Sequence, residues 1–582
     1  MPAKSPRYSR FIAMALVFGL WVLLASPAST RVVDGLPSRP AEPRLSSEIL
    51  EATIHVSAQE ILGPVNRLVF GNAVLPAGQG NGLLDRVGEY EFQFDPVALE
   101  MVRDLKPSVL RFGKQAFFED AIGPQTARHG PRCGWPDWAT FEFGTDEHLA
   151  FLDAIGAPGQ AVILVGYPIA LADSTDPNSC VIEGRQANLS QMVKRAMAWV
   201  AYANSDPQDP TTIGVDDHGF DWGTVGDWAQ KRVANGHPEP YGIRYWEIGN
   251  EVYLLDGSPL TPEEYARDYL VFREAMHRVD PTITIGVEAR VSEEYDRTWN
   301  EPLLTILGDN IDAVILHIYY PFIPYSPAHD LALVAAAQQA DKDMARIHRL
   351  IAQTVSQPDE VCLLITESGV HLGPEDAVTW NRLLVGVYDA DLLGLYVERS
   401  SSYHIDLAVQ HWLHGQSPTA DINYDWATGE RYRRPDYYAL QMWTQHFGGA
   451  LISNTVASPT FDLPEQHGRV KPTYDIPYLS VHTSLGGDKL YLLVINRHLT
   501  DTITTTVHIA GFYPKADADV YTLNGQSYNA TNESGSHDTV VITHTMISNA
   551  GKDLAVAFPA HSVTAIELSE AAPRVYLPRV SR

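Results

Sequence analysis

Eight short apolar segments recur between residues 67 and 411, and segments with helical spacing lie between several of them. The apolar segments are 67–71, 108–112, 161–165, 243–248, 283–287, 313–317, 362–366 and 407–411. The helical patterns include 191–203, 262–279 and 331–354. Strands that alternate with helices are typical of parallel βαβ units. Because eight such units close into a barrel, the pattern predicts an α/β fold of the (β/α)₈ TIM-barrel class.

The pattern changes after Gly449, where short alternating segments are separated by Gly, Asn and Asp turns. Strands are expected at 479–482, 490–496, 502–508, 518–522, 539–545, 554–558 and 563–568. This spacing indicates a C-terminal antiparallel β-sandwich. The alternating segment near 49–60 is expected to join that sandwich, and 436–447 to form the last barrel helix.

The N-terminus has the pattern of a secretory signal peptide. Lys4, Arg7 and Arg10 precede the apolar run 11–25, and Ser-Pro-Ala-Ser follows it. The run is shorter than the roughly 20 residues that a membrane span requires, which favours a secreted protein over a retained signal anchor. The expected organisation is a signal peptide at 1–29, a linker at 30–47, the early strand at 48–62, the barrel at 63–448, the sandwich at 449–570 and a tail at 571–582.

Composition limits the partners of the chain. A net charge of −29 argues against nucleic acid, because phosphate binding requires a basic surface. No stable membrane insertion is expected once the signal peptide is removed. The chain has three cysteines. Cys133 and Cys180 lie in polar segments and are candidates for a disulfide in an oxidising compartment, whereas Cys362 lies within an apolar run.

Two glutamates follow strand-like segments. Glu251 comes after Tyr-Trp-Glu-Ile-Gly-Asn at 245–250, and Glu367 comes after the apolar run that ends at 366. The carboxyl ends of barrel strands are where catalytic groups collect. Two such carboxylates are what a glycoside hydrolase requires, about 5 Å apart in a retaining enzyme. Because two like charges at that separation cannot both ionise freely, the pKa of one carboxyl group is raised, and that group becomes the acid.

The residue before Glu251 favours a division of roles between the two glutamates. Asn250 carries an amide that can bind the 2-hydroxyl of a sugar, so Glu251 is predicted to be the acid/base and Glu367 the nucleophile. The alternative is that either glutamate is a capping or ion-pairing residue at a strand end.

Other strand ends carry side chains that suit the same site. His317 and Tyr319 lie beside the end of the sixth strand, where a tyrosine can donate a hydrogen bond to the nucleophile. Trp412 follows the eighth strand and is a candidate floor for the sugar. Arg111 closes the second strand and is predicted either to lower the pKa of the nucleophile or to form a structural ion pair. Glu247 is interpreted as a group inside the barrel.

Several segments resemble glycoside hydrolase family 51, the α-L-arabinofuranosidase family of the clan A barrels. They are Trp-Val-Ala-Tyr-Ala-Asn at 199–204, Trp-Ala-Gln-Lys-Arg at 228–232, Asn-Gly-His-Pro-Glu-Pro-Tyr at 235–241, Tyr-Trp-Glu-Ile-Gly-Asn-Glu at 245–251 and Ala-Met-His-Arg-Val-Asp-Pro at 275–281. The resemblance implies an acid/base at Glu251, a nucleophile at Glu367, and supporting roles for Tyr319 and Trp412. It also implies a C-terminal β-sandwich, retaining hydrolysis without a metal or other cofactor, and frequent homo-oligomers.

The chain departs from that family at three places. The segment 70–76 has no acidic residue, Arg111 is followed by Phe-Gly-Lys-Gln instead of Tyr-Pro-Gly-Gly, and Glu367 lies between Thr and Ser instead of Asp and Trp. The leading prediction is a secreted retaining hydrolase that removes terminal α-L-arabinofuranosyl residues from plant polysaccharides or oligosaccharides. The alternatives are an endo-acting β-glucanase or xylanase of the same clan, and a non-catalytic carbohydrate-binding surface protein.

Overall fold

The computed structural model describes most of the chain from Leu50 onward. The described residues are 50–75, 78–88, 91–115, 118–128, 142–157, 161–165, 185–254, 260–373, 377–533, 535 and 537–571. The predicted signal peptide and linker, all but the first residue of the tail, and the predicted Cys133–Cys180 disulfide lie outside them. Across the described ranges, no helix combines the length and apolar character needed to span a membrane.

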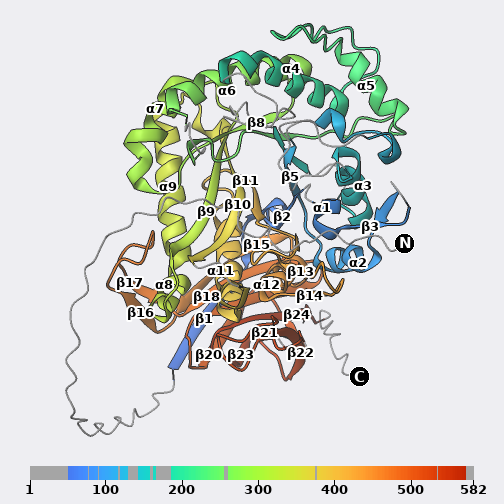
Figure 1. Ribbon diagram of the computed structural model, residues 1–582. Helices are drawn as coiled ribbons and strands as arrows, with labels where there is room; N and C mark the ends of the chain where they lie inside the picture. Colours follow the sequence, from blue (N-terminus) through green and yellow to red (C-terminus); the bar gives the residue numbers. More distant parts are fainter. Residues whose placement is uncertain are drawn as a thin grey trace, which may run out of the picture. The chain divides into compact units, whose positions relative to one another are not determined.

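Eight parallel strands close into a barrel, which confirms the predicted TIM-barrel class (Figure 1). In barrel order they are β10 (Cys362–Gly373), β11 (Ile405–Gln410), β2 (Gly71–Val74), β5 (Leu110–Gln115), β6 (Ala161–Val165), β7 (Tyr245–Ile248), β8 (Thr284–Glu288) and β9 (Ala313–Pro324). All four residues of β7 are buried. Strands covered on both faces have continuous apolar runs, which explains why the sequence shows runs instead of alternation here.

Helices cover the outside of the barrel (Figure 1). The longer ones are α2 (Pro96–Leu105), α3 (Thr145–Ile155), α4 (Arg185–Asn204), α5 (Val225–Ala234), α6 (Pro262–Val279), α9 (Ala336–Thr354), α11 (Leu383–Arg399) and α12 (Pro435–Gln445). Shorter ones are α1 (Gly78–Gly82), α7 (Glu301–Leu307), α8 (Asp330–Val334) and α10 (Ala377–Trp380). The start of α6 is set locally, because Thr261 and Glu264 form a capping box and Pro262 occupies the first turn.

The first barrel strand lies four residues later than the sequence predicts. Residues Arg67–Val69 form a short 3₁₀ turn, capped by the Asn66 side chain, which accepts a hydrogen bond from the Leu68 amide. The strand begins at Gly71, where a Cβ atom would lie 2.5 Å from the Ala408 carbonyl oxygen. The close approach of β11 therefore requires glycine at this position, and the strand extends into 71–74 instead of ending at 71.

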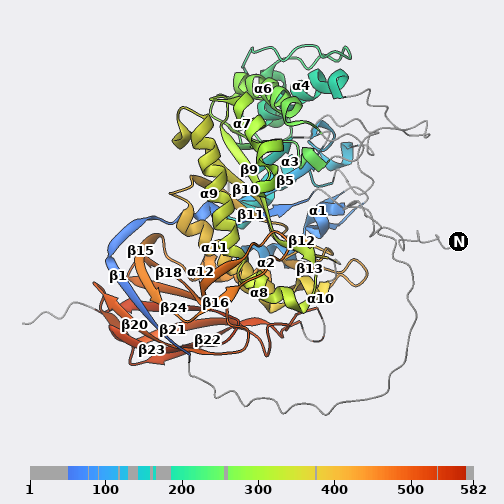
Figure 2. The ribbon, with the colours of Figure 1, turned by 90° about the vertical axis from the view of Figure 1, so that its left-hand side faces the viewer.

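The C-terminal strands form one nine-stranded sheet, which confirms the second predicted domain type (Figure 2). Its order is β22 (Val541–Ser548), β21 (Pro514–Asn524), β24 (Ser562–Glu570), β19 (Lys489–Asn496), β18 (Leu479–Gly486), β15 (Ala450–Ala457), β1 (Leu50–Pro64), β20 (Ile503–Ala510) and β23 (Asp553–Phe558). Ile54 of β1, Val507 of β20 and Ile566 of β24 share one buried core. Strands that lie far apart in the sheet order therefore pack on the same core.

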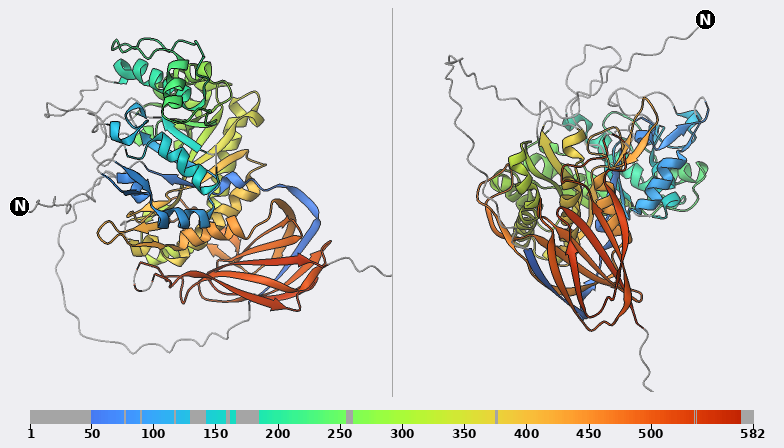
Figure 3. Two further views of the ribbon diagram at one scale, coloured as in Figure 1. Left: turned by 90° about the vertical axis from the view of Figure 1, so that its right-hand side faces the viewer. Right: turned by 90° about the horizontal axis from the view of Figure 1, so that it is seen from below.

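The early strand β1 lies inside this sheet. It pairs antiparallel with β15 and parallel with β20, so one pairing departs from the expected antiparallel arrangement. Figure 3 shows β1 in blue among the orange and red strands. Because β1 lies between two strands that follow the barrel in sequence, the N-terminal part of the described chain is integrated into the C-terminal sheet.

The sheet packs against the barrel through β19 and β24. Along β19, Leu492 and Val494 enter the sheet core, whereas Leu493 and Ile495 join the large core of the barrel. Helices α11 and α12 contact this second face. The strand is therefore buried on both faces, and the two parts of the described chain share a continuous apolar interface.

Candidate active site

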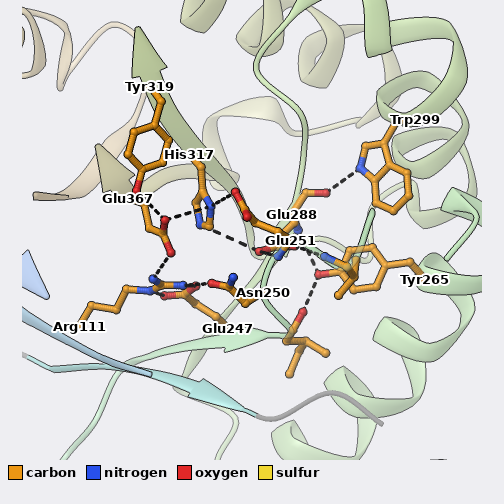
Figure 4. Close-up of polar contacts among 12 residues, drawn as sticks. Arg111, Glu247, Asn250, Glu251, Tyr265, Glu288, Trp299, His317, Tyr319 and Glu367 are labelled. Carbon is orange, nitrogen blue, oxygen red and sulfur yellow. Dashed lines mark hydrogen bonds and ion pairs between the residues drawn. The ribbon is translucent and has the colours of Figure 1, made fainter. Parts of the chain in front are cut away.

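Glu251 lies in a turn directly after β7. Its backbone is left-handed, with φ of 47°, and Gly249 two residues earlier also has a positive φ. A non-glycine residue in this region costs about 1 kcal/mol or more and persists only where its surroundings hold it. From this turn the Glu251 side chain points toward His317 (Figure 4).

Glu367 and its neighbours come from two long adjacent strands. The sequence predicts that these strands end near residues 317 and 366, but β9 continues to Pro324 and β10 to Gly373. The two pair along their whole length, with Glu367 opposite His317 and a register shift just before it. Tyr319 lies two residues after His317 on β9, on the same face of the strand. The bulge redirects the side chain of Glu367 into the site.

The structure brings Glu251, His317 and Glu367 together. Carboxylate oxygens of both glutamates and a ring nitrogen of His317 lie within 4.8 Å of one another. His317 Nδ1 is 3.1 Å from Glu251 Oε1 and 3.7 Å from Glu367 Oε2. Burial alone lowers the pKa of His317, but the nearby carboxylates outweigh it and raise that pKa to about 9. The imidazole is therefore protonated at neutral pH and lies between the two acids.

Arg111 forms ion pairs with both Glu367 and Glu247, so the structural pairing considered from the sequence is present, while its effect on the nucleophile stays a prediction. Its guanidinium donates to Glu367 Oε1 at 2.7 Å and to both oxygens of Glu247 at 2.8 and 3.0 Å. It also donates to Asn250 Oδ1 at 2.9 Å. Burial lowers the pKa of Arg111, but Glu247 and Glu367 raise it above its ordinary value. The arginine is a permanent charge that orients Glu367 and Asn250.

Tyr319 completes the surroundings of Glu367. Its hydroxyl donates to Glu367 Oε2 at 2.6 Å, so each oxygen of this carboxylate has a donor. Burial and the adjacent Glu367 keep the pKa of Tyr319 well above its ordinary value. The phenol is thus a donor at neutral pH, and a carboxylate with two charge-assisted hydrogen bonds is favoured in its ionised form.

Glu288, at the end of β8, is part of the site although the sequence analysis does not single it out. Its oxygens accept from the Glu251 amide at 2.7 Å and the Val252 amide at 3.1 Å. The available signal was the same one that identified the other two glutamates, an acid closing an apolar run, here 283–287. Burial raises the pKa of Glu288 to about 7, against the opposing effects of His317 and the two amides.

Trp412 lies two residues after β11, at the same end of the barrel. Its backbone pairs with Thr419 and Asp421, its ring packs against His411, and the peptide bond between His411 and Trp412 is cis. The indole N–H is buried and, within the part of the chain that the structure describes, has no protein acceptor. The predicted role of Trp412 as a floor for the sugar stays a prediction.

Among the described residues, Glu251, His317 and Glu367 are the group with ligand atoms close enough to share a metal ion. The surroundings oppose that use. The Arg111 guanidinium lies 2.7 Å from a Glu367 oxygen, so a fixed cation already binds this carboxylate. A metal ion at this centre would bind close to that fixed positive charge, which opposes its binding.

Two family models match this chain. The α-L-arabinofuranosidase 1 domain matches residues 101–321, and the α-L-arabinofuranosidase C-terminal domain matches residues 419–562. The chain belongs to the family 51-like glycoside hydrolases. In this hydrolase, Glu251 lies inside the first matched segment and Glu367 between the two. The predicted resemblance and the predicted enzyme class are both confirmed, and the non-catalytic alternative is set aside.

Known relatives match this family 51-like hydrolase over most of its length. A probable α-L-arabinofuranosidase C of Aspergillus terreus is 25% identical, covering 91% of this chain and 96% of the relative. The arabinose complex of α-L-arabinofuranosidase from Thermotoga maritima is 24% identical with a TM-score of 0.71, covering 89% of this chain and 100% of that one. A family 51 α-L-arabinofuranosidase from Thermotoga petrophila is 23% identical with a TM-score of 0.71, at the same coverage. The structural matches show a shared fold.

Proposed function

We propose that this hydrolase removes terminal α-L-arabinofuranosyl residues with retention of configuration, using Glu367 as nucleophile and Glu251 as acid/base. The observation that carries the proposal is the separation of the two carboxylates, whose oxygens lie within 4.8 Å of each other. Retaining enzymes hold their carboxyl groups about 5 Å apart, whereas inverting enzymes need roughly 6.5 to 9.5 Å to admit a water molecule.

The proposed reaction has two displacement steps. In the first, a Glu367 oxygen forms a bond to the anomeric carbon while the bond from that carbon to the leaving oxygen breaks. The leaving oxygen takes the proton of the Glu251 carboxyl group. In the second, Glu251 accepts a proton from water, whose oxygen attacks the anomeric carbon and releases Glu367 as a carboxylate. The two glutamates return to their starting protonation states.

The surroundings of the two acids support this division of roles. Arg111 and Tyr319 donate to the two oxygens of Glu367, which favours an ionised nucleophile with a fixed orientation. The Glu251 side chain is 28% exposed against 8% for Glu367. An acid/base has to exchange protons with a leaving group and with water, so the more accessible carboxyl group suits that task.

The choice of sugar is supported by the two matched α-L-arabinofuranosidase domains and by the Aspergillus terreus relative, a probable α-L-arabinofuranosidase. Hydrolysis of 4-nitrophenyl α-L-arabinofuranoside, β-xyloside and β-glucoside by the mature protein tests it. We expect release from the arabinofuranoside alone. Activity on β-xylan or β-glucan, with no release from any aryl monosaccharide, would favour the endo-acting alternative.

Two variants test the residue roles. Glu367→Ala removes the nucleophile, so turnover should be abolished and azide should restore it with an inverted glycosyl azide as product. Glu251→Ala removes the acid, so natural substrates should lose far more activity than activated aryl glycosides, which need little protonation. Equal losses on both substrate types would contradict the acid/base role.

We also propose secretion, which is supported by the charged, apolar and small-residue zones of residues 1–29. Expression of the full chain with its native N-terminus should release mature protein into an extracytoplasmic fraction. N-terminal sequencing should then begin near residue 30. Protein that retains residues 1–29 and sediments with membranes would favour a signal anchor.

A further inference from the structure

The backbone of Glu251 is held by one buried carboxylate on the neighbouring strand. Glu251 has a left-handed φ of 47°, a conformation that has to be stabilised from outside the residue. Glu288 accepts the amide hydrogens of both Glu251 and Val252, at 2.7 and 3.1 Å. Two consecutive amides that converge on one carboxylate fix the orientation of the peptide between them, and with it the direction in which the Glu251 side chain leaves the chain (Figure 4).

Glu288 is itself fixed by two aromatic residues from different elements. The Tyr265 hydroxyl, on α6, accepts from the Glu288 amide at 3.1 Å and donates to the Ile248 carbonyl at 2.6 Å, which bridges β8 to β7. The Trp299 indole donates to the Glu288 carbonyl at 3.0 Å. These two bonds hold the backbone of Glu288 in place between β7, α6 and the segment that carries Trp299.

Stability alone does not account for an acid at this position. Glu288 is 1% exposed, and the arginine of the site, Arg111, is paired with Glu247 and Glu367. The charged partner it faces is His317, whose Nε2 lies 4.0 Å from Glu288 Oε1. A buried carboxylate of this kind is expensive to desolvate, and an apolar residue of similar volume is often neutral or stabilising. The contacts of its carboxylate, however, are with the turn that carries Glu251 and with the histidine that faces that turn.

We infer that Glu288 is a positioning residue that holds the Glu251 turn so that its carboxyl group reaches the leaving oxygen of the substrate. This inference rests on the proposed acid/base role of Glu251. Glu288 acts through the backbone and touches no reacting atom. Its removal should therefore impair proton donation more than nucleophilic attack, because Arg111 and Tyr319 hold Glu367 independently of it.

The test is the dependence of kcat/KM on the leaving group, measured with a series of aryl glycosides of the sugar that the enzyme cleaves. In Glu288→Ala, kcat/KM should fall about a hundredfold for substrates with poor leaving groups, which is roughly what a displaced catalytic group costs. For the 2,4-dinitrophenyl glycoside the fall should be less than about threefold, because this leaving group needs little protonation. Glu288→Gln retains one acceptor oxygen and should give an intermediate dependence. It also provides a milder variant if the alanine protein does not fold.

Asp312→Asn is the matched control. Asp312 accepts from the amide of Ile285 at 3.2 Å, so it is a carboxylate bound to the same strand β8, near its other end. This variant should lose stability but keep the leaving-group dependence of the wild type. A uniform loss across the series in both Glu288 variants, or no loss in a folded Glu288→Ala, would overturn the inference.

Glu251→Ala in the same series separates the two hypotheses. If it shows the steep leaving-group dependence and Glu288→Ala does not, the positioning role is wrong and the acid/base role stands. If Glu251→Ala loses activity uniformly, the acid/base role itself is wrong, and the inference about Glu288 fails with it.

Discussion

Tyr319 and Tyr320 are adjacent residues of β9 with different partners. The Tyr319 hydroxyl donates to Glu367, whereas the Tyr320 hydroxyl donates to Asp343 of α9, also at 2.6 Å. Successive side chains of a strand point to opposite faces, so one phenol faces the site inside the barrel and the other faces the helix layer. The pair therefore offers a natural comparison between a functional and a structural hydrogen bond.

Tyr319→Phe should lower kcat by about a hundredfold, the loss that is usual for a single preorganised donor at a catalytic charge. Tyr320→Phe should leave kcat within about twofold of the wild type and lower the free energy of unfolding by about 1–3 kcal/mol, because Asp343 loses a buried donor. Steady-state kinetics and urea unfolding of both variants measure this. Equal kinetic effects in the two variants would contradict the assigned role of Tyr319.

The raised pKa of His317 predicts how stability depends on pH. A folded-state pKa of about 9, against 6.5 in the unfolded chain, means that the stabilisation is complete below pH 6.5 and is lost as the pH rises through 9. The loss should be on the order of 3 kcal/mol. Glu288 also has a raised pKa, of about 7, so its own contribution to stability is lost as the pH rises to about 7. The change in stability between pH 7 and pH 9.5 therefore reports mainly on His317.

Urea unfolding at pH 7 and pH 9.5 of the wild type and of His317→Gln measures the contribution of the imidazole. The wild type should lose more stability over this interval than the variant, which has no group to deprotonate at this position. An equal loss in both proteins would show that the charge of His317 does not stabilise the folded state.

At the scale of elements, β1 determines how the N-terminal part of the described chain is anchored. Ile54 and Val56 face the core of the C-terminal sheet, whereas Ile61 lies in the irregular part of β1 and is 63% exposed. The same strand thus contains a fully buried and a largely exposed isoleucine. Their contributions to stability should differ by the free energy of burying one side chain.

Ile54→Ala should lower the free energy of unfolding by about 2–5 kcal/mol, through lost apolar burial and the cavity left behind. Ile61→Ala should change it by less than about 0.5 kcal/mol. Chemical denaturation of both variants, with activity measured in parallel, checks this. If Ile61→Ala destabilises as much as Ile54→Ala, the burial pattern of β1 is wrong.

At the scale of the whole described chain, a buried ion pair joins the sheet to the barrel helices. Arg497, which follows β19, binds both oxygens of Asp391 on α11 at 2.8 and 2.6 Å, and both side chains are at most 5% exposed. Together with the apolar contacts of β19, this pair makes the interface resemble a domain interior. We expect the barrel and the sheet to unfold in one transition.

Arg497→Met should lower the free energy of unfolding by about 3–5 kcal/mol, because Asp391 is left buried without its partner. Arg399→Met is the control. Arg399 pairs with Asp341, but the two side chains are 38% and 25% exposed, so the loss should be below about 1 kcal/mol. Calorimetry of Arg497→Met should show one transition, shifted to lower temperature than in the wild type. A second, separate transition in this variant would indicate that the ion pair couples the unfolding of the barrel to that of the sheet.

The order of elements and the two candidate acids could be predicted from the sequence, because they depend on local patterns. Apolar runs separated by helical spacing indicate parallel strands, and an acid that closes such a run lies at the barrel end whatever the packing details. The start of β2 differs from the prediction because residues 67–69 form a 3₁₀ turn capped by Asn66, which the apolar run conceals. The need for glycine at 71 is not local, since it comes from the approach of β11, a strand more than three hundred residues later.

The sequence by itself determined the fold class, the C-terminal sheet and the candidate roles of Glu251 and Glu367, because hydrophobic period and residue type are properties of short segments. Only the tertiary structure decided that Arg111 serves Glu247 and Glu367 together, that β9 and β10 continue past the site, and that Glu288 holds the Glu251 turn. Those features depend on distances between side chains of different strands. The closure of the barrel sets these distances, and no single segment encodes them.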